Sequence, residues 1–139
     1  MRNLIWLIII GITVALASAW NRPRYTGPLL GEWGCVICNS SFQNTYRADG
    51  VVEYSPRYFG GPVTYATYEV DETHSPPVIT TTEQRGDLVI KRCSIWTITA
   101  EGKLRVQPFN AGEKIPTGFP NDPDPMLYSR VPLESQGQN

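Results

Sequence analysis

Twelve prolines are spread through the 139 residues of this chain. Proline lacks a backbone N–H donor and breaks the interior of a helix, so this distribution argues against a helical domain. From Leu29 onward, short runs rich in valine, isoleucine, threonine, tyrosine and tryptophan alternate with glycine, proline, aspartate and asparagine. This alternation is typical of β-strands separated by turns, and it predicts an all-β fold.

The pattern predicts about eight strands joined by short connections. They are expected near Glu32–Asn39, Gln43–Arg47, Val51–Tyr58, Val63–Val70, Pro77–Glu83, Leu88–Thr99, Lys103–Phe109 and Met126–Val131. Short connections favour an antiparallel up-and-down meander, in which each strand pairs with the next. A meander keeps two open edges unless it closes on itself, so we expect a barrel or a half-barrel.

The longest predicted strand, Leu88–Thr99, indicates what faces the interior. Four apolar side chains share one face of it: Leu88, Ile90, Trp96 and Ile98. The same alternation turns Arg92 and Ser94 toward that face. Either a β-bulge shifts the register near Cys93, or the interior contains a polar site.

Residues 1–19 have the pattern of an export signal. Arg2 precedes an apolar run from Leu4 to Ala17, and Ala17-Ser18-Ala19 supplies the small residues that a signal peptidase reads. We expect cleavage before Trp20 and export to the periplasm, the cell envelope or the medium. An uncleaved membrane anchor is the alternative, although the run is shorter than the roughly 20 residues that span a bilayer. The remaining chain divides into a linker at 20–28, a barrel domain at 29–132 and a frayed tail at 133–139.

The chain has three cysteines, Cys35, Cys38 and Cys93, and an odd number permits at most one internal disulfide. Cys35 and Cys38 fall in one predicted strand, where their side chains point to opposite faces. If a disulfide forms, we therefore expect Cys93 to pair with Cys35 or with Cys38. A zinc site would need further ligands, and only His74 remains, so no metal site is expected.

Charge and motifs exclude several classes of function. The formal net charge is −1 and the basic residues are scattered, so nucleic acid is not an expected partner. The sequence contains no G-x-S-x-G, H-E-x-x-H or phosphate-binding glycine loop. Its one histidine, His74, lies in a proline-rich turn. We expect a protein that is not an enzyme and needs no cofactor.

Short motifs in a fixed order extend from Leu29 to Val131. Leu29-Leu30-Gly31-Glu32-Trp33 opens the series, and Ile95-Trp96-Thr97-Ile98, Lys103-Leu104-Arg105-Val106, Pro116-Thr117-Gly118-Phe119 and Leu127-Tyr128-Ser129-Arg130 follow. The set resembles the small bacterial lipocalin-like domains that begin with L-x-G-x-W. The chain departs from that pattern at Cys35-Val36-Ile37-Cys38 and in its tyrosine-rich middle strands.

The resemblance implies a small exported antiparallel barrel from a family largely without an assigned biochemical function. In lipocalin-like barrels the tryptophan of the first motif lies across one barrel end, and a basic side chain of the last strand stacks on it. Here these positions are Trp33 and Arg130. Lipocalins in general carry small apolar molecules, which is an analogy from the fold.

On this basis we expect a small, mostly apolar ligand inside the barrel. The candidate ligand-binding residues are Trp33, Tyr54, Tyr65, Ile90, Arg92, Trp96 and Leu104. An inward Arg92 would meet a ligand carboxylate. The alternative is a structural or protein-interaction module of the cell envelope whose barrel is filled by its own side chains, and the volume of the interior cavity separates the two. No membrane contact is expected once residues 1–19 are removed, and the sequence does not indicate an oligomeric state.

Overall fold

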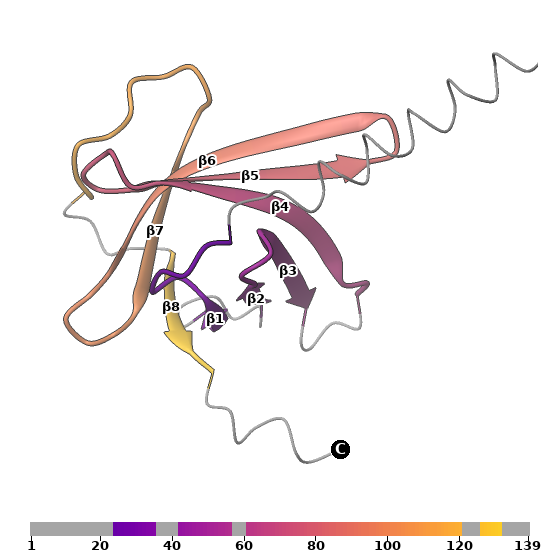
Figure 1. Ribbon diagram of the computed structural model, residues 1–139, viewed down its shortest axis with the longest axis horizontal. Helices are drawn as coiled ribbons and strands as arrows, with labels where there is room; N and C mark the ends of the chain where they lie inside the picture. Colours follow the sequence, from indigo (N-terminus) through magenta and orange to yellow (C-terminus); the bar gives the residue numbers. More distant parts are fainter. Residues whose placement is uncertain (1–23, 36–41, 57–60, 121–125, 132–139) are drawn as a thin grey trace, which may run out of the picture.

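The computed structural model describes residues 24–35, 42–56, 61–120 and 126–131, and this part of the chain is built from eight strands (Figure 1). Their bounds are β1 Gly31–Cys35, β2 Phe42–Tyr46, β3 Val51–Pro56, β4 Thr64–Asp71, β5 Val78–Arg85, β6 Leu88–Ile98, β7 Leu104–Phe109 and β8 Leu127–Arg130. The described residues include no helix that is long and apolar enough to span a membrane.

Each strand pairs antiparallel with the next, and β8 pairs with β1, so the sheet closes into a barrel with the order β1 to β8. The predicted all-β meander is therefore confirmed, and it forms a full barrel and not a half-barrel. Glycine permits the tight turns of two hairpins: Gly50 and Gly102 have φ of 79° and 73°, in the left-handed region that favours glycine. These turns join β2 to β3 and β6 to β7.

The apolar core occupies one end of the barrel, which we call the closed end. The turns 47–50, 72–77 and 99–103 and the segment 24–30 lie at this end. Nine buried residues form the cluster: Leu29, Trp33, Tyr46, Val52, Ala66, Tyr68, Ile79, Trp96 and Leu104. The opposite end, where β2, β4 and β6 begin, is called the open end.

Trp33 and Arg130 join the first strand to the last at the closed end. They are direct partners in the β1–β8 register, and the Arg130 Cζ lies 4.3 Å from the centroid of the Trp33 ring. The Arg130 guanidinium also donates to the carbonyls of Leu30 and Pro28 at 2.9 and 2.8 Å. The Trp33 indole, which is fully buried, donates to the carbonyl of Leu29 at 2.8 Å. The predicted contact is confirmed, and it fixes the segment before β1 as well as the strand ends.

Part of the predicted linker packs against the barrel. Tyr25 contacts Tyr68 edge to face, with ring centroids 6.2 Å apart, and Tyr68 makes the same kind of contact with Tyr46 at 5.3 Å. Residues 24–30 thus cover the closed end. The predicted signal at 1–19, the beginning of the linker and the tail at 133–139 lie outside the described residues.

The predicted disulfide of Cys93 is wrong. Cys93 is a free, half-buried thiol in the middle of β6, 3.8 Å from the Thr80 hydroxyl, whereas Cys35 is disulfide-bonded. The physical reason is the strand order: β1 has β2 and β8 as neighbours, so β6 lies well around the barrel from Cys35. Cys38 lies outside the described residues.

Replacing Arg130 with glutamine tests how much this contact stabilises the barrel. We expect Arg130→Gln to lower the free energy of unfolding by about 1–2 kcal/mol, because it removes a cation–π contact and two charge-assisted hydrogen bonds. Urea denaturation measures the change. The control is Arg47→Gln, which removes a half-exposed ion pair to Asp49 and should cost less than about 1 kcal/mol. Equal losses in the two variants would contradict the closing role of Arg130.

Candidate ligand-binding pocket

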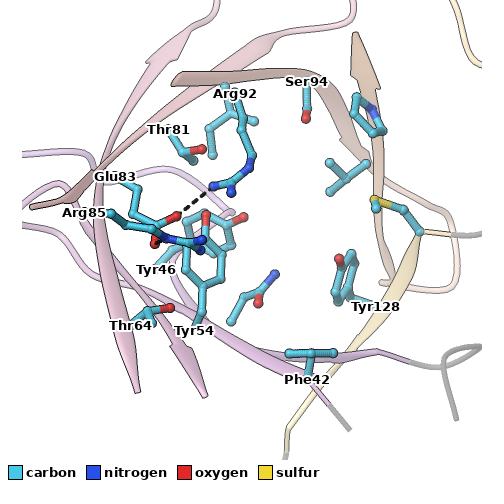
Figure 2. A pocket seen from close by; sticks show the side chains of 15 residues that line it. Phe42, Tyr46, Tyr54, Thr64, Thr81, Glu83, Arg85, Arg92, Ser94 and Tyr128 are labelled. Atoms are coloured by element: carbon cyan, nitrogen blue, oxygen red, sulfur yellow. Dashed lines mark hydrogen bonds and ion pairs between the residues drawn. The ribbon is translucent and has the colours of Figure 1, made fainter. Parts of the chain in front are cut away.

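A cavity of about 370 Å³ lies inside the barrel toward the open end (Figure 2). Its volume is within the range of small-molecule sites in proteins. Side chains from β2 to β8 and the residue before β8 line it: Phe42, Asn44, Tyr46, Tyr54, Thr64, Ile79, Thr81, Glu83, Arg85, Arg92, Ser94, Val106, Pro108, Met126 and Tyr128. The barrel therefore has a core at its closed end and an open space above it.

The pairing register of β6 decides whether a β-bulge turns Arg92 and Ser94 outward or whether they face the interior. The register of β6 with β5 runs without interruption from Leu88 to Ile95, and that with β7 from Cys93 to Ile98. No bulge interrupts these ladders, so Arg92 and Ser94 face inward with Trp96 and Ile98. The interior contains a polar site, as the second alternative predicts.

A buried carboxylate between two arginines dominates the electrostatics of the cavity. The Glu83 side chain is only 5 % exposed, and its two oxygens accept from Arg85 Nε at 2.5 Å and from Arg92 Nη1 at 2.9 Å. These hydrogen bonds lower the pKa of Glu83 from its ordinary value. Glu83 is thus ionised at neutral pH, and the two half-exposed arginines leave one positive charge in excess.

Three tyrosines give the cavity a polar lining that remains uncharged. Burial raises the pKa of Tyr46, Tyr54 and Tyr128, and a hydrogen bond to the Asn44 side chain partly opposes the rise at Tyr46 and Tyr128. At Tyr54 a hydrogen bond to Thr81 has the same opposing effect. The three phenols therefore remain protonated at neutral pH and act as hydrogen-bond donors or acceptors.

Apolar and charged groups occupy different sides of the cavity. Glu83, Arg85 and Arg92 come from β5 and β6, and Figure 2 shows them together, with Phe42 and Tyr128 across the cavity. Four apolar lining residues come from β2, from β7, which neighbours β6, and from the position before β8: Phe42, Val106, Pro108 and Met126. The cavity is amphipathic, with a cationic side and an apolar side.

The structure places two of the seven predicted ligand-binding residues, Tyr54 and Arg92, in the lining. Trp33, Trp96 and Leu104 point inward but belong to the core of the closed end, below the cavity. Ile90 pairs with Glu83 and is half-buried outside the lining.

The prediction that Tyr65 lines the pocket is wrong. Tyr65 is 56 % exposed on the outer side of β4. Thr64, which pairs with the inward Tyr54, lines the cavity in its place. The reason is the pleat of the strand: neighbouring residues face opposite sides, so the position after Thr64 must face outward.

Sequence reasoning misses Glu83 and Arg85 as site residues. Gln84-Arg85-Gly86-Asp87 has the composition of a turn, whereas β5 continues through Arg85 and the reversal uses Gly86, with φ of 58°. The alternation of Ile79, Thr81, Glu83 and Arg85 is the signal that could have found them.

Other polar clusters lie away from the cavity. His74 Nδ1 lies 3.1 Å from Asp71 Oδ2, and the Thr73 hydroxyl donates to Asp71 at 2.6 Å, all on an exposed turn of the closed end. Among the residues that the structure describes, no group of three or more His, Cys, Asp and Glu side chains is placed to hold a metal ion.

The fold and the cavity together define a closed, eight-stranded antiparallel β-barrel with an amphipathic pocket at one end. In comparisons with protein-family models, curated protein sequences and solved structures, none matches this chain. The assignment of function therefore rests on the pocket itself.

Glutamine at position 83 tests the charge arrangement through acid stability. Because the folded-state pKa of Glu83 lies below the ordinary value of 4.5, its ion pairs stabilise the fold above that pH. This contribution is lost as the pH falls through the folded-state pKa. We expect Glu83→Gln to reduce the free energy of unfolding at pH 7 and to shrink the difference between pH 7 and pH 3, as measured by urea denaturation.

The control for this prediction is Glu69→Gln, which removes a carboxylate from β4 and leaves the three pocket charges in place. It should keep most of the wild-type difference between the two pH values. A Glu83→Gln variant with an unchanged pH dependence would show that the ion pairs of Glu83 do not stabilise the fold.

Proposed function

We propose that the protein is a non-catalytic, lipocalin-like binding protein for a small, mostly apolar molecule that carries one anionic group. The observation that carries this proposal is the amphipathic cavity, in which a buried carboxylate holds two arginines beside an apolar wall. The ligand body would lie against Phe42, Val106 and Pro108. Its anionic group would face Arg92 and Arg85.

The arginines retain donors for such a group. A guanidinium has five N–H donors in a fixed fork, and Glu83 accepts one hydrogen bond from each of Arg85 and Arg92. The phenols of Tyr54 and Tyr128 and the Ser94 hydroxyl supply further neutral partners at the cavity wall. One excess positive charge favours a ligand with a single negative charge, because a neutral ligand would leave that charge uncompensated.

The size of the cavity favours ligand binding over the alternative of a filled structural barrel. A barrel of eight strands can be filled by its own side chains. In this barrel the filling stops at the closed end, and about 370 Å³ remains free inside the open end. Export of the chain by residues 1–19 remains part of the proposal, since a carrier of this kind would act outside the cell.

Two matched probes separate the charge from the apolar body of the ligand. Anilinonaphthalene sulfonate and N-phenylnaphthylamine share their aromatic body, and only the first is anionic. We expect the wild-type chain to bind the anionic probe more tightly, with one site per chain. Arg92→Gln should weaken the anionic probe about tenfold, because it removes a charge-assisted contact, and should change the neutral probe less than about twofold.

Fluorescence titration at neutral pH measures both affinities. A Lys114→Gln variant, which removes a positive charge outside the lining, serves as the control and should bind both probes like the wild type. Equal weakening of both probes by Arg92→Gln would point to a general packing effect. Failure of the wild-type chain to bind either probe with a defined stoichiometry would overturn the proposal.

A further inference from the structure

The hairpin of β5 and β6 projects beyond the rest of the barrel at the mouth of the pocket. The pairing of β5 with β4 ends at Thr82, and the pairing of β6 with β7 ends at Cys93. Residues 83–92 therefore form a two-stranded extension, which we call the arm. Figure 1 shows the hairpin reaching past the other strands. Its inner face holds the charged residues of the pocket.

The tip of the arm exposes two large apolar side chains. Leu88 and Val89 are 61 % and 58 % exposed, directly after the turn at Gly86 and Asp87. A solvated hairpin tip has no packing reason to carry such residues. The other large hydrophobics that are strongly exposed in the described part of the chain lie at the open end as well: Phe42, Val63 and Tyr65. The exposed apolar groups thus surround the mouth of the pocket.

Cations lie immediately behind this apolar tip. Lys91 and Arg92 follow Leu88 and Val89 along β6, and Arg85 lies across the hairpin, opposite Leu88. The arm also carries two carboxylates, of which Glu83 is held in ion pairs and Asp87 lies in the turn. Three cations against two carboxylates leave the arm one net positive charge, and Asp87 lies in the turn next to the exposed apolar pair.

We propose that the arm inserts its tip into a lipid surface that carries anionic headgroups, with the pocket opening toward that surface. Leu88 and Val89 would enter the acyl boundary, and Lys91 would lie at the level of the phosphates. Along β6 the apolar pair Leu88 and Val89 is followed by Lys91 and Arg92, which matches the order of acyl boundary and phosphate layer, while Asp87 would lie in the turn beside the apolar pair. The proposal goes beyond ligand binding and revises the expectation that the chain has no membrane contact after residues 1–19 are removed.

A lipid surface fits these observations better than a protein partner or a second copy of the chain. The apolar groups come from β2, from β4 and the residue before it, and from the arm, so they ring the mouth instead of forming one groove for a peptide. A symmetric pairing of two arms along β6 would bring the cations of both copies together, which is unfavourable. The proposed ligand, being mostly apolar, would itself partition into a bilayer, so a mouth held at that surface shortens its path.

A spin label at the arm tip tests the proposal in the full chain. A nitroxide is attached to Val89→Cys in a Cys93→Ser background, and the chain is mixed with vesicles of phosphatidylcholine alone or with equal parts of phosphatidylglycerol. Only the labelled position reports, so residues 1–19 do not contribute to the signal. We expect the label to gain access to oxygen and lose access to a water-soluble nickel chelate on the anionic vesicles, with little change on the neutral ones.

Two further variants make the outcome decisive. Lys91→Gln, which does not alter the cavity lining, should lower the ratio of immersed to free label about fivefold on anionic vesicles. A label at Glu101→Cys, on an exposed hairpin of the closed end, should stay in water on both vesicles. Two outcomes would overturn the proposal. The label at position 89 could stay in water on both kinds of vesicle, as expected if the arm binds a protein partner, or it could be immersed equally in both.

One further variant distinguishes a failure of the ligand-binding proposal from a failure of the membrane proposal. Ser94→Phe, which fills the cavity, should abolish binding of anilinonaphthalene sulfonate and leave the immersion of position 89 unchanged. The labelled chain should in turn bind that probe normally in the absence of vesicles. If Ser94→Phe lost both probe binding and immersion of position 89, membrane insertion of the arm would not be independent of the pocket, which contradicts the proposal. A circular dichroism melt checks that the variant is folded.

Discussion

The pairing of β1 with β8 is the constraint on which the rest of the molecule depends. Without it the eight strands would form an open sheet with two free edges and no interior. The ladder between these strands is short, with three paired positions, and one of them joins Trp33 to Arg130. Arg130 also binds two carbonyls of the segment before β1. The same side chain therefore closes the barrel and holds the segment that seals its end, which places stability at the closed end.

Concentration of packing at one end leaves the other end available for function. Trp33, Trp96 and Leu104 fill the space below the cavity, so the upper interior needs few apolar side chains and can carry phenols and charges. Polar interior groups are tolerated there because they find partners: Glu83 with two arginines, and the tyrosines with Asn44 and Thr81.

The sequence predicts the strand number, the meander and the Trp33–Arg130 contact, because each follows from alternation, turn residues or a short motif. It leaves Arg92 open between an inward position and a β-bulge, and the uninterrupted ladders of β6 decide for the inward position. Alternation shows which side chains point inward but not how far along the axis they lie. That depth depends on strand tilt and stagger, which one sequence does not specify. For this reason the sequence predicts Trp33 and Leu104 in the pocket, whereas both lie in the core. Tyr65 shows the other limit: a shift of one position reverses the face of a residue.

Glu83 explains how the pocket can keep two arginine side chains, Arg85 and Arg92, in place without a ligand. A carboxylate removed from water is costly unless its partners are charged and hydrogen-bonded, and Glu83 has two such partners at 2.5 and 2.9 Å. Those bonds hold Arg85 and Arg92 at the mouth and reduce the side-chain freedom that an incoming anion would otherwise have to remove. Because Glu83 accepts one hydrogen bond from each guanidinium, the anionic group of the proposed ligand would add to the network without displacing Glu83. In the proposed function, anion recognition would therefore depend on the same buried charge that holds Arg85 and Arg92 in place.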